Sequence, residues 1–226
     1  MSASTKSDWS EYYQNNDYAV PEFIDNALWR NYERMLRKHL ADHRAPIVVT
    51  ELGGANSVYY RRFKESFNIQ KYNIVDNNEV GLKLFPHTDD PQVTLNNIDL
   101  MEPLPAWLLG SSDVVVSSGL IEHFTPADTE RLLKLHFDVS RPRGLVLVSF
   151  PTPTLIYRGF RRFLEMTGKF PPLYERPILE SEIQPIVNAL GETLDCYKIW
   201  TTILTQLFFV VRTSGDTRLN PGAQPK

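Results

Sequence analysis

The feature that most constrains the fold of this chain is a regular alternation of short apolar runs with longer segments of helical periodicity. Three of the runs are almost continuously apolar and rich in β-branched residues, as expected of central parallel strands covered on both faces. Two long runs near the C-terminus have only a few residues between them and predict an antiparallel hairpin. The predicted strands are 47–52, 72–75, 93–95, 113–117, 145–150, 194–201 and 206–213.

The segments between these runs carry helix signals. Apolar residues recur at helical spacing over 22–40, which predicts an N-terminal helix. Before the fifth run, Thr125 is expected to cap a helix with Pro126 in its first turn, and the Arg-Pro-Arg-Gly sequence at 141–144 is expected to end it. Ser181 and Gly191 mark the start and end of another helix. Strands alternating with helices predict an α/β fold with a doubly wound, mostly parallel seven-stranded sheet and a C-terminal antiparallel hairpin.

Length and composition fit a globular protein of one domain. The chain has 226 residues, and we expect a single domain over 1–213 that includes an N-terminal helical cap at about 8–43. A proline-interrupted lid with an amphipathic core is expected at about 151–180, and residues 214–226 are polar enough to predict a disordered tail. The oligomeric state is left open by the sequence.

Charge and cysteine content exclude several classes of protein. The formal net charge is −3, so we expect no nucleic-acid partner. Cys196 is the single cysteine, and the histidines show no metal-ligand spacing; both observations predict that no metal is bound. The polar N-terminus and the lack of a long apolar run predict neither a secretory signal nor a transmembrane segment. A cytoplasmic location is therefore expected.

The turn after the first strand, Glu51 to Ser57, is the segment richest in chemical information. Its small residues allow a ligand to approach the backbone. A dinucleotide fingerprint requires glycine where Ala55 and Val58 stand. The carboxylate of Glu51 repels a pyrophosphate and attracts the ammonium group of an amino acid. The turn therefore predicts a ligand with an amino-acid part and no phosphates.

Two further acids follow the second and third strands. Asp76 ends the second strand 23 positions after Gly53, where a carboxylate accepts hydrogen bonds from both hydroxyls of a ribose. Asp99 follows the third strand, where it can accept from an adenine amino group, and its neighbour Ile98 can line the ring face. Together the two acids predict an adenosine ligand.

These segments, together with Ser112 to Phe124 after them, resemble the seven-stranded (class I) S-adenosylmethionine-dependent methyltransferases over roughly residues 45–150. The resemblance implies a Rossmann-like methyltransferase fold, S-adenosyl-L-methionine as the cofactor and an enzyme that transfers its methyl group. In that family the glycine turn holds the methionine part, the acid after the second strand holds the ribose, and the acid after the third contacts adenine. This chain departs from the family pattern at Ala55 and Ser57, where glycines are usual. The cofactor-binding residues implied are Glu51, Gly53, Gly54, Ala55, Asp76, Asn77, Ile98, Asp99, Ser117 and Ser118.

The acceptor side is predicted to lie at Ser117 to Phe124, after the fourth strand. His123 is the candidate general base, because an imidazole titrates near neutrality; the alternative is that His123 and Glu122 only shape the loop. In the lid, the candidate acceptor residues are Tyr157, Arg158, Arg161 and Arg162. The arginines are either a solvated face, a site for an anionic acceptor, or a contact with an anionic membrane surface. The aromatic residues expected either to cap the cofactor or to pack against the domain are Trp9, Tyr12, Tyr13 and Tyr18.

The function predicted from these residues is methyl transfer to an oxygen or nitrogen of a small-molecule acceptor. A sugar-containing intermediate of glycan or lipopolysaccharide assembly, anionic or lipid-linked, is the first acceptor considered, because the lid resembles those of methyltransferases in such pathways. The alternatives are a natural-product methyltransferase and a catalytically inactive binding or scaffold module that kept the fold. A nucleotide-dependent oxidoreductase is disfavoured by Glu51 and Ala55.

Overall fold

A computed structural model describes residues 9–14, 22–170, 173–200 and 205–215. Tyr18, Thr201 and the tail residues 216–226, all part of the sequence predictions above, lie outside this described part of the chain. Within the described residues, no helix is long and apolar enough to cross a bilayer.

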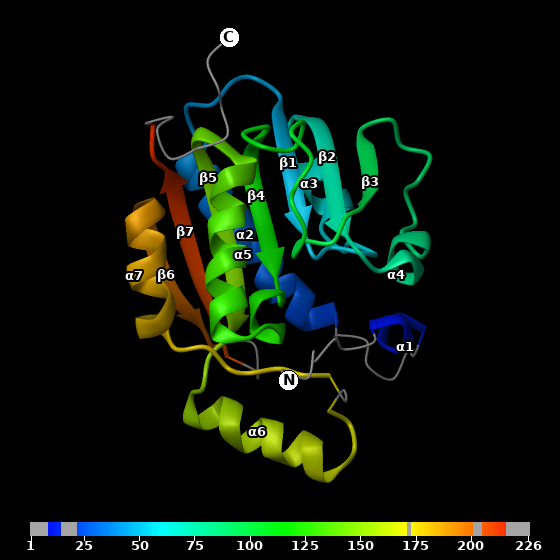
Figure 1. Ribbon diagram of the computed structural model, residues 1–226, viewed down its shortest axis with the longest axis vertical. Helices are drawn as coiled ribbons and strands as arrows, with labels where there is room; N and C mark the ends of the chain where they lie inside the picture. The colour runs from blue at the N-terminus through cyan, green and yellow to red at the C-terminus, as the bar shows by residue number, and fades with distance from the viewer. Residues whose placement is uncertain (1–8, 15–21, 171–172, 201–204, 216–226) are drawn as a thin grey trace.

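The core element is one seven-stranded sheet with the order β3-β2-β1-β4-β5-β7-β6 (Figure 1). The first five strands are parallel to one another, and β7 runs antiparallel to both β5 and β6. This arrangement confirms the predicted sheet and its terminal hairpin. The strands are β1 (Ile47–Leu52), β2 (Ile69–Asp76), β3 (Val93–Asn97), β4 (Ser112–Ser118), β5 (Ser140–Pro151), β6 (Gly191–Ile199) and β7 (Gln206–Thr213).

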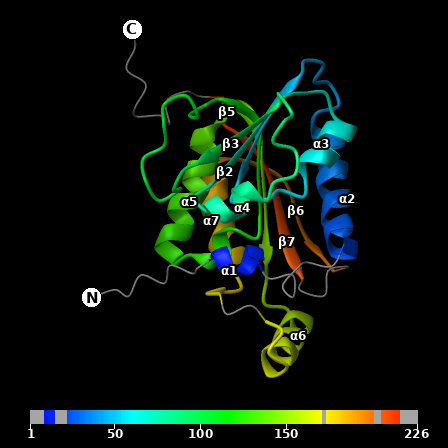
Figure 2. The same cartoon turned by 90° about the vertical axis from the view of Figure 1, so that its right-hand side faces the viewer.

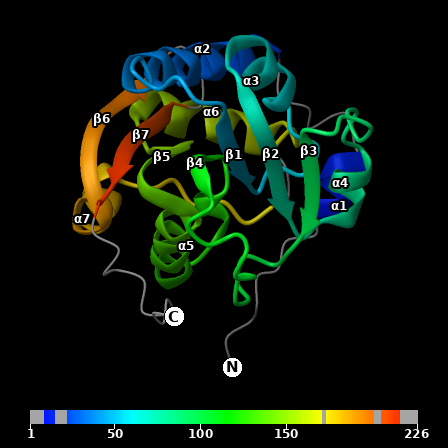
Figure 3. The same cartoon turned by 90° about the horizontal axis from the view of Figure 1, so that it is seen from above.

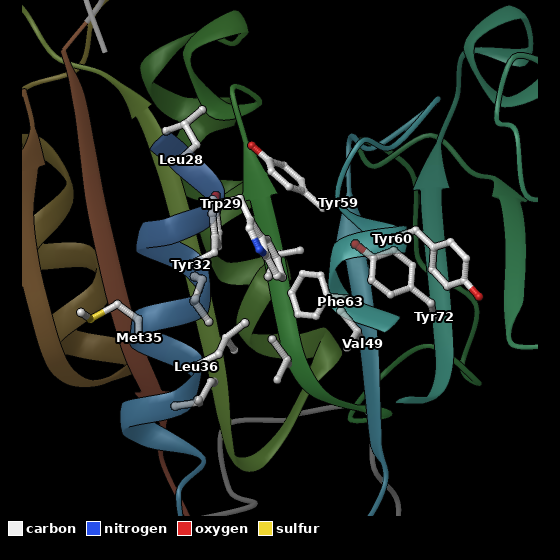
Figure 4. Packing of buried hydrophobic residues seen from close by; sticks show 14 of the residues in the cluster. Leu28, Trp29, Tyr32, Met35, Leu36, Val49, Tyr59, Tyr60, Phe63 and Tyr72 are labelled. Carbon is white, nitrogen blue, oxygen red and sulfur yellow. The ribbon is translucent and has the colours of Figure 1, made fainter. Parts of the chain in front are cut away.

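Helices cover both faces of the sheet (Figure 3). One face is covered by α2 (Glu22–His39) and α3 (Tyr60–Ser66), and the other by α5 (Pro126–Val139) and α7 (Glu180–Leu190). On α2, the side chains of Leu28, Trp29, Tyr32 and Leu36 are buried against the sheet (Figure 4). Each such side chain contributes roughly 1.5–3 kcal/mol through its removal from water, so α2 belongs to the core. The predicted N-terminal cap at about 8–43 therefore includes a helix that lies on a sheet face.

The helix signals were partly right. Thr125 caps α5 by accepting a hydrogen bond from Asp128 N, and Gly191 follows the last residue of α7, as predicted. The prediction that residues 141–144 end the helix was wrong, because α5 ends at Val139 and these residues begin β5. Their irregularity appears instead as a shift in the β4–β5 register and a positive φ of 64° at Arg143. Ser181 lies inside α7, which starts at Glu180 without a side-chain cap.

The order of the strands fixes where a ligand site belongs. Strands β1 and β4 are neighbours, and the chain proceeds from them toward opposite edges of the sheet. In doubly wound sheets ligands bind at this switch point, outside the carboxyl ends of the strands. At this end of the sheet lie the short helix α1 (Trp9–Gln14), α4 (Glu79–Lys83), the 3-10 turn η2 (Ile121–His123) and the lid helix α6 (Leu155–Met166) (Figures 1 and 2).

Candidate functional site

The turn after β1 has a geometry that requires glycine at two successive positions. Gly53 has a φ of +70°, and a Cβ added to it would lie 2.6 Å from Leu120 Cδ1. A Cβ on Gly54 would lie 2.6 Å from Glu51 Cδ. Gly53 N donates to Val75 O at 2.8 Å, which ties the turn to β2. The turn therefore keeps its backbone close to both neighbouring elements.

Ala55 occupies a strained position in this turn. Its φ of 24° is positive, a conformation that costs a residue other than glycine about 1–2 kcal/mol. A glycine would adopt this φ without that cost. Ala55 N donates to Asp76 Oδ2 at 3.2 Å, and its methyl group fills space left by Gly81, where a Cβ would lie 2.7 Å from Ala55 Cβ. Contacts with β2 and α4 thus hold the strained turn in place.

Glu51 lies beneath the turn and is almost fully buried. Its Oε2 accepts from Ser57 Oγ at 2.5 Å and from Tyr72 OH at 2.7 Å. Burial raises the pKa of this carboxyl to about 7, although both hydrogen bonds act to lower it. Its Oε1 lies beside Gly54, 3.0 Å from where a Cβ would be, so this oxygen faces the backbone of the turn. A cation bound there would restore the charged form of Glu51.

Asp76 ends β2 and organises the next loop. Its Oδ1 accepts from Asn78 N at 2.8 Å, while Oδ2 takes the bond from Ala55 N. Burial raises the pKa of Asp76, and the backbone hydrogen bonds oppose the rise. The backbone of Asn77 also bonds to Asp76, so of the roughly four lone-pair sites of the carboxylate one remains for a further donor. Asn77 beside it is exposed, whereas Asn78 caps α4 by accepting from Gly81 N.

The residues after β3 lie against the same end of the sheet. Ile98 N donates to Asp76 O at 3.0 Å, so the ends of β2 and β3 are joined directly. Asp99 Oδ1 accepts from Met101 N at 2.9 Å. Ile98 packs against the hydrophobic cluster on the α5 side. The structure therefore brings Glu51, Asp76 and Asp99 to the carboxyl ends of three adjacent strands.

The two serines at the end of β4 have different surroundings. Ser117 is buried: its Oγ bonds with His136 Nε2 at 2.8 Å, and its main-chain oxygen accepts from Tyr32 OH at 2.8 Å. Ser118 lies at the strand end, where its Oγ accepts from Ser149 Oγ at 3.1 Å and from Tyr59 OH at 3.3 Å. The side chain available to a ligand is therefore that of Ser118.

His123, on η2, is held in a defined orientation. Its Nδ1 donates to Tyr174 O at 2.6 Å, and the Trp9 ring meets its ring edge to face at 4.6 Å between centroids. Burial lowers the pKa of His123, so the neutral imidazole is favoured and Nε2 carries a lone pair. Nε2 lies 3.9 Å from Glu122 Oε1. Nε2 is therefore the ring nitrogen that is able to accept a proton.

Glu122 is buried beside His123, and burial raises the pKa of its carboxyl well above the ordinary value. Among the described residues, Glu122 Oε2 has no hydrogen-bond partner. Its main-chain oxygen accepts from Arg176 N at 3.0 Å. The Arg176 side chain also bonds Phe124 O and Glu182, so it fixes the lid to the loop after β4.

The lid arginines do not form one group. Arg161 points toward the body, where it donates to Tyr157 OH at 2.8 Å and Glu175 O at 3.1 Å. Tyr157 is buried and donates to Glu175 Oε1 at 2.7 Å. Arg158 and Arg162 are exposed. The structure thus separates an inward pair, Tyr157 and Arg161, from two outward arginines.

Helix α1 covers the carboxyl ends of β1 and β2. A Cβ on Gly81 would lie 2.8 Å from Tyr13 Cε2, which places the Tyr13 ring beside Ala55 and α4. Burial, followed by the charge of Asp76, raises the pKa of Tyr13. Trp9 meets Tyr12 and Tyr13 as well as His123. Sequence reasoning named these aromatic residues but missed Gly81, Tyr59 and Arg176, whose roles depend on contacts with distant segments.

Searches by sequence found no matching family model and no matching curated protein. Among the described residues there is also no cluster of three or more His, Cys, Asp or Glu side chains able to hold a metal ion.

Solved structures similar to this chain include three methyltransferases. Magnesium protoporphyrin IX methyltransferase from Synechocystis PCC 6803, with bound S-adenosylhomocysteine, has a TM-score of 0.66 and 14% identity over 92% of this chain and 95% of its own. The N-methyltransferase NodS from Bradyrhizobium japonicum, with the same ligand, has a TM-score of 0.65 and 13% identity over 93% and 99%. The 1,6-didemethyltoxoflavin-N1-methyltransferase from Burkholderia thailandensis, with its substrate and S-adenosylhomocysteine bound, has a TM-score of 0.61 and 15% identity over 87% and 91%. The chain therefore has the class I methyltransferase fold, which confirms the predicted fold class.

Proposed function

We propose that this protein is an S-adenosylmethionine-dependent methyltransferase that acts on an oxygen or nitrogen of a small molecule. The observation that carries the proposal is the link between the glycine turn and Asp76 through the Ala55 N to Asp76 Oδ2 hydrogen bond. This link joins a backbone that a ligand can approach closely to a carboxylate, at the carboxyl ends of β1 and β2 and beside the switch point between β1 and β4. Some of the structures similar in fold were solved with S-adenosylhomocysteine or S-adenosylmethionine bound, among them magnesium protoporphyrin IX methyltransferase and NodS.

The residues present fit such a cofactor. Side chains at Gly53 and Gly54 would clash with Leu120 and Glu51, so the turn presents bare backbone to the methionine part. Glu51 Oε1 faces the turn and is assigned to the ammonium group. Asp76 and Asn77 are assigned to the ribose, and Ile98 and Asp99 to adenine. Ser118 is assigned to the part of the cofactor that carries the sulfonium. Ser117, buried directly before it in β4, supports it.

When bound, S-adenosylmethionine supplies a methyl group on a sulfonium, which is already a good leaving group. The chain then has to align the acceptor and remove its proton. We assign the proton to Nε2 of His123, because Nδ1 donates to Tyr174 O and burial favours the neutral ring. A bound S-adenosylmethionine would give its methyl group to the acceptor and become S-adenosylhomocysteine, while the acceptor's proton would pass to His123.

Helix α1 is assigned as a cap on the cofactor. Tyr13 lies beside Ala55 and Gly81, and Trp9 lies on His123. One short helix thus touches both the cofactor side and the acceptor side of the site. Excluding water from both sides is the role that lids have in enzymes of this kind.

The class of acceptor is inferred from the lid and from the solved structures that are similar in fold. Two of the similar proteins act on magnesium protoporphyrin IX and on 1,6-didemethyltoxoflavin according to their names, which favours a small-molecule or natural-product acceptor. The narrower prediction of a sugar-containing intermediate of glycan or lipopolysaccharide assembly has no support from them. Tyr157 and Arg161 lie on the inner side of the lid and are assigned to position the segment that covers the acceptor.

The test is to incubate the protein with S-adenosylmethionine and a panel of small phenols, carboxylic acids, amines and sugars, and to measure S-adenosylhomocysteine formed. Acceptor-dependent formation that is lost in Asp76→Ala supports an enzyme. Tight binding of S-adenosylhomocysteine without turnover on any acceptor favours the alternative, an inactive module that kept the fold.

A further inference from the structure

Helix α6 projects from the body of the protein at the carboxyl ends of the strands (Figures 1 and 2). One side of the helix is fixed: Tyr157 is buried, and Arg161 bonds to Tyr157 and to Glu175 O while its guanidinium lies 4.5 Å from the centroid of the Phe170 ring. The opposite side has to face away from the body.

That outward side is apolar. The exposed fractions are 88% for Leu155, 57% for Ile156, 57% for Phe163 and 77% for Met166. At 100° per residue these four side chains fall within an arc of about 100°. The helix is already anchored through its other side, and this continuous stripe is not buried by the described part of the chain.

The stripe has a basic border. Arg158 and Arg162 lie one helical turn apart beside Leu155 and are exposed, and no ion pair with a described residue engages them. Residues 155–169 carry four basic residues and one acidic residue, in a chain whose formal net charge is −3. Phe and Leu on one side of a helix and arginines at its border are typical of helices that lie in the interface of an anionic bilayer.

We propose that α6 docks this protein on an anionic membrane surface, with Leu155, Ile156, Phe163 and Met166 inserted among the lipids and Arg158 and Arg162 on the headgroups. A second copy of the chain is a poorer occupant, because an α6–α6 contact would bring like-charged arginines together. The acceptor itself is also a poorer occupant, since the stripe is opposite the side that faces the site. Docking in this way brings the acceptor loop at η2 toward the lipid headgroups.

The experiment is flotation of the full chain with vesicles of phosphatidylcholine containing about one third phosphatidylglycerol, and with vesicles of phosphatidylcholine alone. We expect flotation with the anionic vesicles, weaker flotation with neutral ones, and loss of binding at high salt. Arg158→Gln with Arg162→Gln should lower the partition coefficient about 25-fold, because each basic residue near an anionic surface contributes roughly fivefold. Phe163→Ser with Met166→Ser should abolish flotation.

The matched control is Arg131→Gln with Lys134→Gln, which removes the same charge from exposed positions on α5 and should float like the unaltered protein. All variants change exposed side chains, so unchanged thermal unfolding is expected and is measured first. Three results overturn the proposal: no flotation with anionic vesicles, equal loss in the α5 control, or a dimer of the unaltered protein that Phe163→Ser with Met166→Ser dissociates. None of these results depends on methyl transfer, so the proposed function is tested separately.

Discussion

Replacing Glu51 by glutamine should make the protein more stable at neutral and alkaline pH. The Glu51 carboxyl is 5% exposed, and burial raises its pKa from 4.5 to about 7 in the folded protein. Since a rise of one pH unit in pKa corresponds to 1.36 kcal/mol, ionising this group costs the folded state about 3 kcal/mol. A glutamine keeps an acceptor for Ser57 and Tyr72 but never ionises.

The direction of the pKa shift of Glu51 decides how the free energy of unfolding changes with pH. Because the folded pKa lies above the unfolded one, the folded state binds the proton more tightly, and stability is highest below pH 4.5. The contribution of Glu51 to the free energy of unfolding falls as the pH rises from 4.5 to about 7 and is constant above that. The gap between Glu51→Gln and the unaltered protein should therefore grow by up to about 3 kcal/mol between pH 5 and pH 8.

The assay is urea unfolding of both proteins at a series of pH values, with the difference in free energy of unfolding as the readout. Other carboxyls contribute equally to both proteins and cancel in the difference. Glu130→Gln, at an exposed position on α5, is the control and should follow the unaltered protein throughout. A difference that stays constant between pH 5 and pH 8 would refute the reasoning about Glu51.

Three further changes test other parts of the site. Asp76→Ala should weaken S-adenosylhomocysteine binding at least tenfold, because charge-assisted hydrogen bonds contribute about 1.5–3 kcal/mol each; an unchanged dissociation constant in a folded variant removes Asp76 from the cofactor site. Tyr32→Phe should lower the free energy of unfolding by about 1–3 kcal/mol, measured by urea unfolding, since it leaves Ser117 O without its buried donor; no loss means that this bond is unimportant. His123→Gln should lower kcat roughly 100-fold with cofactor affinity unchanged, measured once an acceptor is found; undiminished turnover assigns the histidine a structural role.

The sheet was predictable because each strand leaves a local signal. β1 has the predicted bounds, 47–52, since both its faces are buried and every residue but two is aliphatic. The position of the acids at 51, 76 and 99 along one edge of the sheet was predictable for a related reason: parallel strands bring their carboxyl ends together. The start of β5 was missed, because Arg-Pro-Arg-Gly has the local composition of a turn; in the structure it lies between Ser140 and Leu145, which both pair with β4, and the register shifts across it.

The site beyond these acids was less predictable, because it depends on contacts between distant segments. Ser117 and Ser118 are adjacent in sequence, yet His136 bonds one and Tyr59 the other. The lid arginines share a helix, yet only Arg161 turns inward, because Tyr157 anchors that side. The local sequence therefore does not predict which of the two serines is buried or which of the lid arginines turns inward.

The central claim is that the carboxyl ends of β1, β2 and β3 hold the cofactor. The most direct measurement is calorimetric titration of the full chain with S-adenosylhomocysteine, and separately with NAD. We expect one site per chain with a dissociation constant in the micromolar range for S-adenosylhomocysteine, and no heat with NAD. Binding of NAD without binding of S-adenosylhomocysteine, or no binding of either ligand to a folded protein, would contradict it.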